Sequence, residues 1–157
     1  MTSEPSLQER YSQAFRDDTG ESFAAVTEPD IMLSGSIFSQ PIAGRAQVWL
    51  TLRTAAGIYD ELTFTTAVEA PGRAYLDWTA RALGLDIDGI TVLTVGPAGT
   101  FTGIAIHHRP LGAVLAFSRE MGRQLDGLIE PGHFDAADRR GLQAEHGAAG
   151  KAGEPTS

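Results

Sequence analysis

Two adjacent histidines, His107 and His108, are the side chains of this sequence best suited to acid–base chemistry. Residues 100–108 are predicted to form a β-strand, in which neighbouring side chains point to opposite faces. Ile104 and Ile106 share a face with His108, so His108 is predicted to face the apolar interior. At a pocket rim such a histidine can act as a general acid or base, with its pKa lowered from about 6.5 because burial disfavours the charged form. The alternative is a structural histidine, hydrogen-bonded at the end of the sheet or near a dimer contact.

A second pair of candidate catalytic residues, Tyr59 and Asp60, follows a predicted helix over residues 44–59. The Tyr59 hydroxyl can donate a hydrogen bond to a substrate oxygen, and Asp60 can act as a base if it is partly buried. The alternative is a tyrosine that closes the core, followed by two solvated carboxylates, Asp60 and Glu61, at a helix end.

Aromatic and apolar side chains are the candidates for binding a ligand. Trp78 and Phe64 are expected to form pocket walls, and Trp49 and Ile106 complete the predicted ligand-binding set. Aromatic residues more often belong to the core, so these are expected to serve both roles. No metal site or cofactor is expected, because adjacent histidines on a strand diverge, no third ligand is spaced to join them, and the sequence has no cysteine.

The composition indicates a single acidic domain. The chain has 157 residues, and 12 Lys and Arg against 20 Asp and Glu leave a net charge of −8. An acidic chain without a basic cluster is repelled by phosphate, which argues against nucleic acid and anionic membranes as partners. Apolar stretches are broken within about ten residues, short of the roughly 20 that a membrane helix needs. A cytoplasmic location is the expectation.

The periodicity of apolar residues predicts helices segregated from an antiparallel sheet, which is the α+β class. The expected helices span 6–17, 21–27, 44–59 and 110–125, a hairpin over 30–39 turns at 34–36, and the expected strands span 61–69, 74–83, 87–95 and 100–108. The folded domain is expected to cover residues 6–132. Residues 133–157 are expected to form a disordered tail, because from Asp135 onward Leu142 is the only large apolar side chain.

This order of elements, with the segment Pro41-Ile42-Ala43-Gly44-Arg45, resembles the SnoaL-like branch of the nuclear transport factor 2-like fold, which also includes ketosteroid isomerases. Trp78 in a middle strand and Gly99 in the hairpin before the last strand support the resemblance. It implies a cone-shaped fold, in which a strongly bent antiparallel sheet wraps around the N-terminal helices and a pocket opens beside the helix over 44–59. It also implies dimerisation through the sheet, as in many members.

The sequence departs from the catalytic patterns of that family. Counted from the matching motifs, the catalytic aspartate of ketosteroid isomerases falls near Gly35, and their oxyanion-hole acid falls near Thr91. The cyclases and epoxide hydrolases use an aspartate on the last strand, whereas residues 101–109 hold no carboxylate. The resemblance therefore implies a fold that hosts many chemistries, without their familiar acid–base residues.

Two functions of different classes follow. The first is a pocket for a small apolar, carbonyl-bearing molecule. As an enzyme it would be a cofactor-independent isomerase, cyclase or dehydratase, with His108 as acid or base, Asp60 as a further base and Tyr59 as the donor to a substrate oxygen. The second is a non-catalytic ligand-binding or dimerisation module. A homodimer is expected in either case, through an outer sheet face that carries Thr63, Thr65, Asp77, Thr79 and Arg81.

Overall fold

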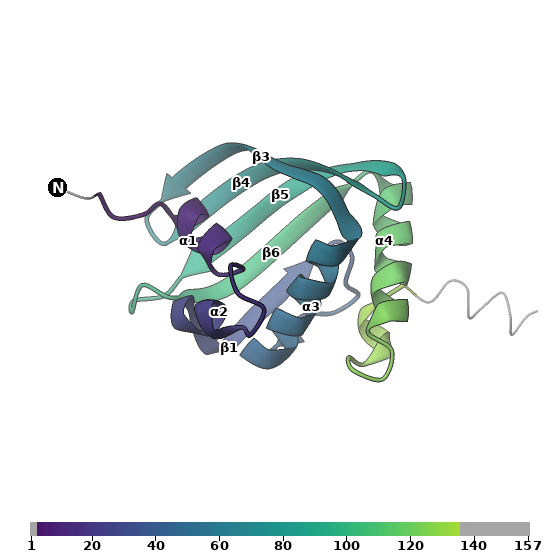
Figure 1. Ribbon diagram of the computed structural model, residues 1–157, viewed down its shortest axis with the longest axis horizontal. Coiled ribbons are helices and arrows are strands. Elements are labelled where there is room, and N and C mark those ends of the chain that lie inside the picture. Colours follow the sequence, from purple (N-terminus) through teal and green to yellow (C-terminus); the bar gives the residue numbers. More distant parts are fainter. Residues whose placement is uncertain (1–2, 136–157) are drawn as a thin grey trace, which may run out of the picture.

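The computed structural model describes residues 3–135, and Figure 1 shows how its helices and strands are arranged. The helices are α1 (Leu7–Gln13), α2 (Glu21–Val26), α3 (Arg45–Ile58), α4 (Leu111–Gln124) and the short 3-10 helix η1 (Pro131–His133). The strands are β1 (Thr27–Gly35), β2 (Ile42–Ala43), β3 (Tyr59–Ala70), β4 (Arg73–Ala82), β5 (Leu85–Val95) and β6 (Phe101–Arg109). No helix among these residues has the length and apolar character needed to cross a membrane.

The six strands form one curved sheet in the order β2-β1-β6-β5-β4-β3. All neighbours are antiparallel except β1 and β6, which run parallel. Helices α1, α2 and α3 lie against the concave face of the sheet, and α4 stands beside α3 at one end (Figure 1). The expected α+β cone with helices inside a bent sheet is confirmed.

The alternation of inward and outward side chains is clearest in β4. Leu76 and Trp78 are almost fully buried, whereas Asp77 and Thr79 between them are exposed. In β6 the same rule buries His108 on the inner face with the two isoleucines predicted to accompany it. The inward direction predicted for His108 is therefore confirmed.

The Pro-x-x-Gly-Arg segment has a structural role in this chain. Arg45 donates through Nε to the Thr27 hydroxyl oxygen at 3.2 Å, and its Nη2 donates to the Thr27 carbonyl. The Thr27 hydroxyl in turn donates to the Phe23 carbonyl at 2.7 Å. These bonds join the start of α3 to the junction of α2 and β1, so they set how α3 lies against the sheet.

The predicted first helix, 6–17, is shorter in the structure and ends at Gln13. Its start is as expected, because Ser6 and Glu9 form a reciprocal capping box. Its end comes early because Asp17 accepts hydrogen bonds from the backbone N–H groups of Gly20 and Ser22, both at 2.8 Å. These bonds hold the turn into α2. Hydrogen bonding from the side chain of Ser22, and then from its backbone, lowers the pKa of Asp17.

The hairpin predicted over 30–39 is wrong. Strand β1 runs through to Gly35, and the following Ser36 N–H donates to the Ile106 carbonyl at 3.1 Å. A Cβ atom at position 35 would lie 2.2 Å from that carbonyl oxygen. Gly35 therefore allows β1 to approach β6 closely, which is a different use of glycine from the predicted turn.

The packed chain continues beyond the expected domain boundary at residue 132. Phe134 is buried and its ring centroid lies 5.9 Å from that of Phe38, while Asp135 pairs with Arg119 at 2.9 Å. Residues 133–135 thus pack on the domain, and the remainder of the predicted tail, 136–157, lies outside the described residues.

Gly89 on β5 gives a direct test of this packing. A Cβ atom there would lie 2.1 Å from the His107 carbonyl oxygen and 2.8 Å from Cζ2 of Trp78. We expect Gly89→Ala to lower the free energy of unfolding by about 1–3 kcal/mol, measured by urea denaturation, because the β4–β5–β6 packing must open. The matched variant Gly112→Ala, on α4 with no atom within 4 Å of the added Cβ, should be neutral or slightly stabilising. Equal stability of the two variants would contradict this packing.

Candidate functional site

A cavity of about 280 Å³ lies between the concave face of the sheet and helices α1 and α3. Its walls come from both helices and from β3, β4, β5 and β6. The lining residues are Tyr11, Ser12, Phe15, Leu52, Ala55, Ala56, Tyr59, Leu62, Phe64, Trp78, Thr91 and Ile106. None of these described lining residues carries a charge, so the polar groups that a ligand meets are hydroxyls.

Tyr59 is placed by two elements at once. It caps the C-terminus of α3, where its N–H donates to the Ala55 carbonyl, and it is the first residue of β3. Its ring packs on Phe117 of α4, with centroids 4.8 Å apart, and edge-on to Trp78 at 5.4 Å. The side chain therefore has little freedom to move away from the cavity wall.

The hydroxyl of Tyr59 is hydrogen-bonded to Nε2 of His108. His108 is 7% exposed and is surrounded by the rings of Tyr59, Trp78 and Phe117. His108 is not among the residues that line the apolar cavity; Tyr59 is, and it connects the imidazole to it. The two predicted catalytic residues thus meet each other, with only the tyrosine in contact with the cavity.

Burial keeps both members of this pair neutral at pH 7. It lowers the pKa of His108 to about 4; the nearby Ile106 carbonyl favours the charged imidazole but does not outweigh the loss of water. Burial likewise raises the pKa of the Tyr59 phenol well above its ordinary value, and the neighbouring Tyr11 adds to the shift. The site therefore offers an uncharged phenol and an uncharged imidazole.

A second hydrogen bond fixes the neighbouring part of the cavity wall. The Nε1 of Trp78 donates to the hydroxyl oxygen of Thr91 at 3.1 Å, and both side chains are almost fully buried. Trp78 thereby links two lining residues, because its ring packs edge-on to the ring of Tyr59 and its N–H donates to the Thr91 hydroxyl.

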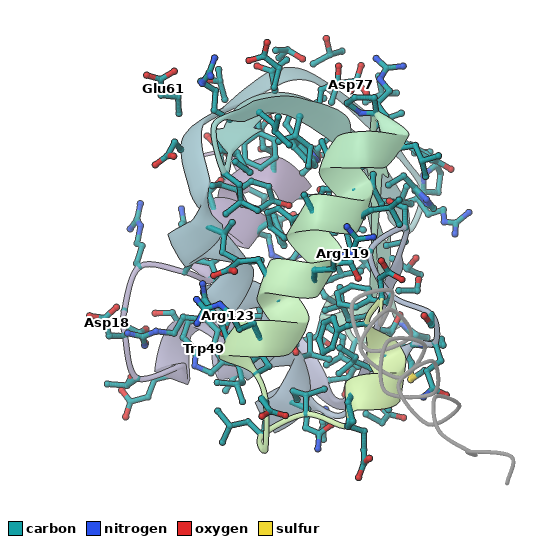
Figure 2. The ribbon with its side chains drawn as sticks, turned by 90° about the vertical axis from the view of Figure 1, so that its right-hand side faces the viewer. Asp18, Trp49, Glu61, Asp77, Arg119 and Arg123 are labelled. Carbon is teal, nitrogen blue, oxygen red and sulfur yellow. The ribbon has the colours of Figure 1, made fainter. Side chains whose placement is uncertain are left out.

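Three of the four predicted ligand-binding residues, Trp78, Phe64 and Ile106, line the cavity. Trp49 does not. It stacks on Phe15 at 5.7 Å and packs on Phe23 at 5.3 Å, and Figure 2 shows it at the periphery near the loop of Asp18.

The third predicted catalytic residue, Asp60, is exposed and is absent from the described cavity lining. Strand alternation explains this, because Asp60 follows the inward Tyr59 and so points to the other face. The neighbouring Glu61 likewise points outward (Figure 2). Within residues 3–135 no cluster of three His, Asp or Glu side chains is placed to hold a metal ion.

Tyr11 and Thr91 are polar residues of the cavity wall that were not predicted as site residues, and Tyr11 is the less expected of the two. It lies on α1, is 8% exposed, lines the cavity, and its hydroxyl makes no hydrogen bond with the described residues. Its place in the apolar stripe of the first helix is equally that of a core residue, so periodicity does not single it out. The signal in the sequence is the hydroxyl itself, since a buried phenol normally finds a polar partner and an unpartnered one suits a ligand.

The pH dependence of stability tests the environment of His108. An unfolded chain protonates this histidine below about pH 6.5, whereas the folded chain resists protonation down to about pH 4. Lowering the pH through this window therefore favours the unfolded state, by about 3 kcal/mol in full. We expect the wild type to lose this much more stability between pH 7 and pH 4 than His108→Gln, which cannot titrate, in chemical denaturation. Parallel pH profiles would show that His108 is not held neutral.

Comparison with known proteins identifies the fold. No family model and no curated protein matches the sequence. A steroid delta-isomerase from Pseudomonas aeruginosa superposes with a TM-score of 0.64 at 20% identity, over 68% of this chain and 80% of that one. An uncharacterised protein with a cystatin-like fold from Silicibacter pomeroyi DSS-3 gives 0.69 at 15% identity, over 89% and 94%.

A third similar structure is a protein provisionally named a SnoaL-like polyketide cyclase, from Jannaschia sp. CCS1. Its TM-score is 0.57 at 13% identity, over 74% of this chain and 98% of that one. At these identities the likeness concerns the fold alone. The chain has the nuclear transport factor 2-like fold that the resemblance of its sequence predicted.

Proposed function

We propose that this domain binds a small, largely apolar molecule in the cavity between α1, α3 and the sheet. The observation that carries the proposal is the lining itself, in which buried aromatic and aliphatic side chains surround a few hydroxyl groups and no charge. Sites of this composition suit small ligands, because apolar contact gives affinity and a few fixed polar groups give orientation. The volume of about 280 Å³ favours a ligand at the small end of the usual range.

The similar structures support an organic ligand of this kind. One of them is a steroid delta-isomerase and another is provisionally named a polyketide cyclase. Such substrates combine an apolar carbon framework with oxygen functions, which matches the apolar walls and hydroxyls of this cavity. A carbonyl-bearing apolar molecule therefore remains the proposed ligand class.

Ala56 allows the cavity to be blocked from a partly open position. It is exposed on α3 yet contributes to the lining, so a large side chain there can fill space without entering the core. We expect Ala56→Trp to abolish the fluorescence gain of the neutral apolar probe N-phenyl-1-naphthylamine, and to remove any co-purified ligand seen in native mass spectrometry. The control Ala46→Trp, also exposed on α3 but outside the lining, should bind the probe as the wild type does. Unchanged binding by Ala56→Trp would place the ligand elsewhere.

A second candidate function is cofactor-independent proton transfer, as in an isomerase, cyclase or dehydratase. The hydrogen bond between Tyr59 and His108 favours it, because a phenol at the cavity wall can pass a proton to a neutral imidazole behind it. A group with a pKa of about 4 is a weak base, so this chemistry would need a substrate proton that is itself acidic. Asp60 is too far out on the surface to replace it as the base in this cavity.

Paired histidine variants test the catalytic candidate. With a substrate that turns over, we expect His108→Ala to lower kcat about 10²–10⁴-fold while sparing ligand affinity, since the lost group takes part in proton transfer. His107→Ala is the control, because His107 is exposed on the opposite face. If the two variants turn over equally, the domain is better described as a non-catalytic binding module.

Homodimer formation through the outer sheet face also remains a proposal. This face carries the partly exposed apolar side chains Tyr75 and Ile90 beside Asp77, which points outward (Figure 2). An ion pair between Arg109 and Asp88 lies at its end. Mixed apolar and charged rows can pair with themselves across a two-fold axis. Sedimentation equilibrium should give twice the mass of the chain; a single species of monomer mass at micromolar concentration would refute the dimer.

A further inference from the structure

The hydroxyl groups of Tyr59 and Thr91 are each hydrogen-bonded to a side chain of the protein. These bonds determine which of the two can donate to a ligand and which can accept from it. The contact between Tyr59 and His108 holds one proton, supplied either by the phenol or by Nε2 of the imidazole. The two cases present opposite polarity to a ligand. If the phenol donates to His108, its oxygen faces the cavity as an acceptor; if the imidazole donates, the phenol proton is free for the ligand.

The chemistry of the two groups decides between these cases. Nδ1 of His108 is buried with no hydrogen-bond partner among residues 3–135, and Nε2 faces the Tyr59 hydroxyl. A phenol, with an ordinary pKa of about 10, is the stronger proton donor of the two groups, and an imidazole nitrogen is the stronger acceptor. A neutral imidazole carries a single proton, which therefore belongs on Nδ1. Nε2 is then an acceptor, and the Tyr59 phenol is its donor.

Thr91 has the opposite polarity. Its oxygen accepts from Nε1 of Trp78, which has no other role than donor, and its own proton has no acceptor among the described residues. Thr91 is 3% exposed and lines the cavity, so its hydroxyl proton is accessible to a ligand in the cavity but hardly to bulk water.

We propose that the cavity selects its ligand by the positions of hydrogen-bond donors and acceptors. Tyr59 accepts from a ligand O–H or N–H, and Thr91 donates to a ligand oxygen. The proposal rests on the proposed binding function and narrows the ligand to an apolar molecule that carries a hydroxyl, enol or N–H group as well as a carbonyl or ether oxygen. Tyr59 is thus assigned the reverse of the donor role predicted from the sequence.

Two naphthalene derivatives of similar shape separate the two polarities. 2-Naphthol can donate a hydrogen bond, whereas 2-methoxynaphthalene can only accept one. A buried hydrogen bond lost or left unmade changes affinity by about tenfold or more. Affinities are measured by titration followed by tryptophan fluorescence. We expect Tyr59→Phe to weaken the binding of 2-naphthol by about that factor. The binding of 2-methoxynaphthalene should be unchanged or tighter, since the variant removes an acceptor that this ligand leaves unpaired.

Thr91→Val should give the converse result. It should weaken the binding of 2-methoxynaphthalene, because the ether oxygen of this ligand loses the Thr91 hydroxyl as its donor. Tyr75→Phe removes a hydroxyl from the outer face and should change neither affinity. Comparing each variant with both ligands cancels differences in ligand size and hydration.

The outcomes distinguish this inference from the function on which it rests. Weakening of 2-methoxynaphthalene by Tyr59→Phe would show that Tyr59 donates, and it would overturn the polarity while leaving the binding function intact. Equal effects of Tyr59→Phe on both ligands would overturn it as well. The proposed function fails if neither compound binds the wild type and Ala56→Trp matches the wild type in probe fluorescence and native mass spectrometry. This inference then fails with it.

Discussion

The exclusion of water from one imidazole is the constraint on which the site depends. His108 lies on the inner face of β6, enclosed by the rings of Tyr59, Trp78 and Phe117 from β3, β4 and α4. Burial makes the charged form unfavourable, so the ring stays neutral and has one proton to place. The position of that proton determines what the Tyr59 hydroxyl can offer, and thus what the cavity can recognise.

The same arrangement bears on the balance between binding and catalysis. A phenol with a raised pKa and an imidazole with a lowered one are both poor at exchanging protons near pH 7, where a general base works best with a pKa near that value. Their neutrality is well suited to a binding site, because uncharged hydroxyls can be desolvated with a ligand at modest cost. The neutrality of the pair therefore supports the proposed binding function, and proton transfer would require a substrate with an unusually acidic hydrogen.

Much of the fold could be predicted where one face of an element is buried and the other is exposed. The alternation in β4 and the shared face of Ile104, Ile106 and His108 in β6 give a clear register, because a shift by one residue would expose the apolar set. The edge strand β3 gave a weaker signal, since bulges near Asp60 and Phe64 interrupt its alternation and most of it is exposed. The strand and its inward Phe64 could be predicted, whereas the outward position of Asp60 could not.

The predictions that failed depend on contacts between distant parts of the chain. Gly35 looked like a turn residue, and only the proximity of the Ile106 carbonyl explains it. Trp49 packs on Phe15, in the turn after α1, and on Phe23 of α2. Helical periodicity alone cannot separate that side of α3 from the side that meets the cavity. Tyr11 was not among the predicted site residues for the same reason. Periodicity predicts that a side chain is buried. Whether that side chain contacts other core residues or lines a cavity depends on the packing of distant segments.

The protonation of the His108 ring tests the central claim most directly. In a ¹⁵N-labelled protein at pH 7, long-range ¹H–¹⁵N correlation spectra report which imidazole nitrogen carries the proton. The structure predicts a neutral ring with the shift of a protonated nitrogen at Nδ1 and of an unprotonated acceptor at Nε2, changed at Nε2 by Tyr59→Phe. A proton on Nε2, or a charged ring at pH 7, would contradict both the neutral pair and the hydrogen-bond polarity assigned to the cavity.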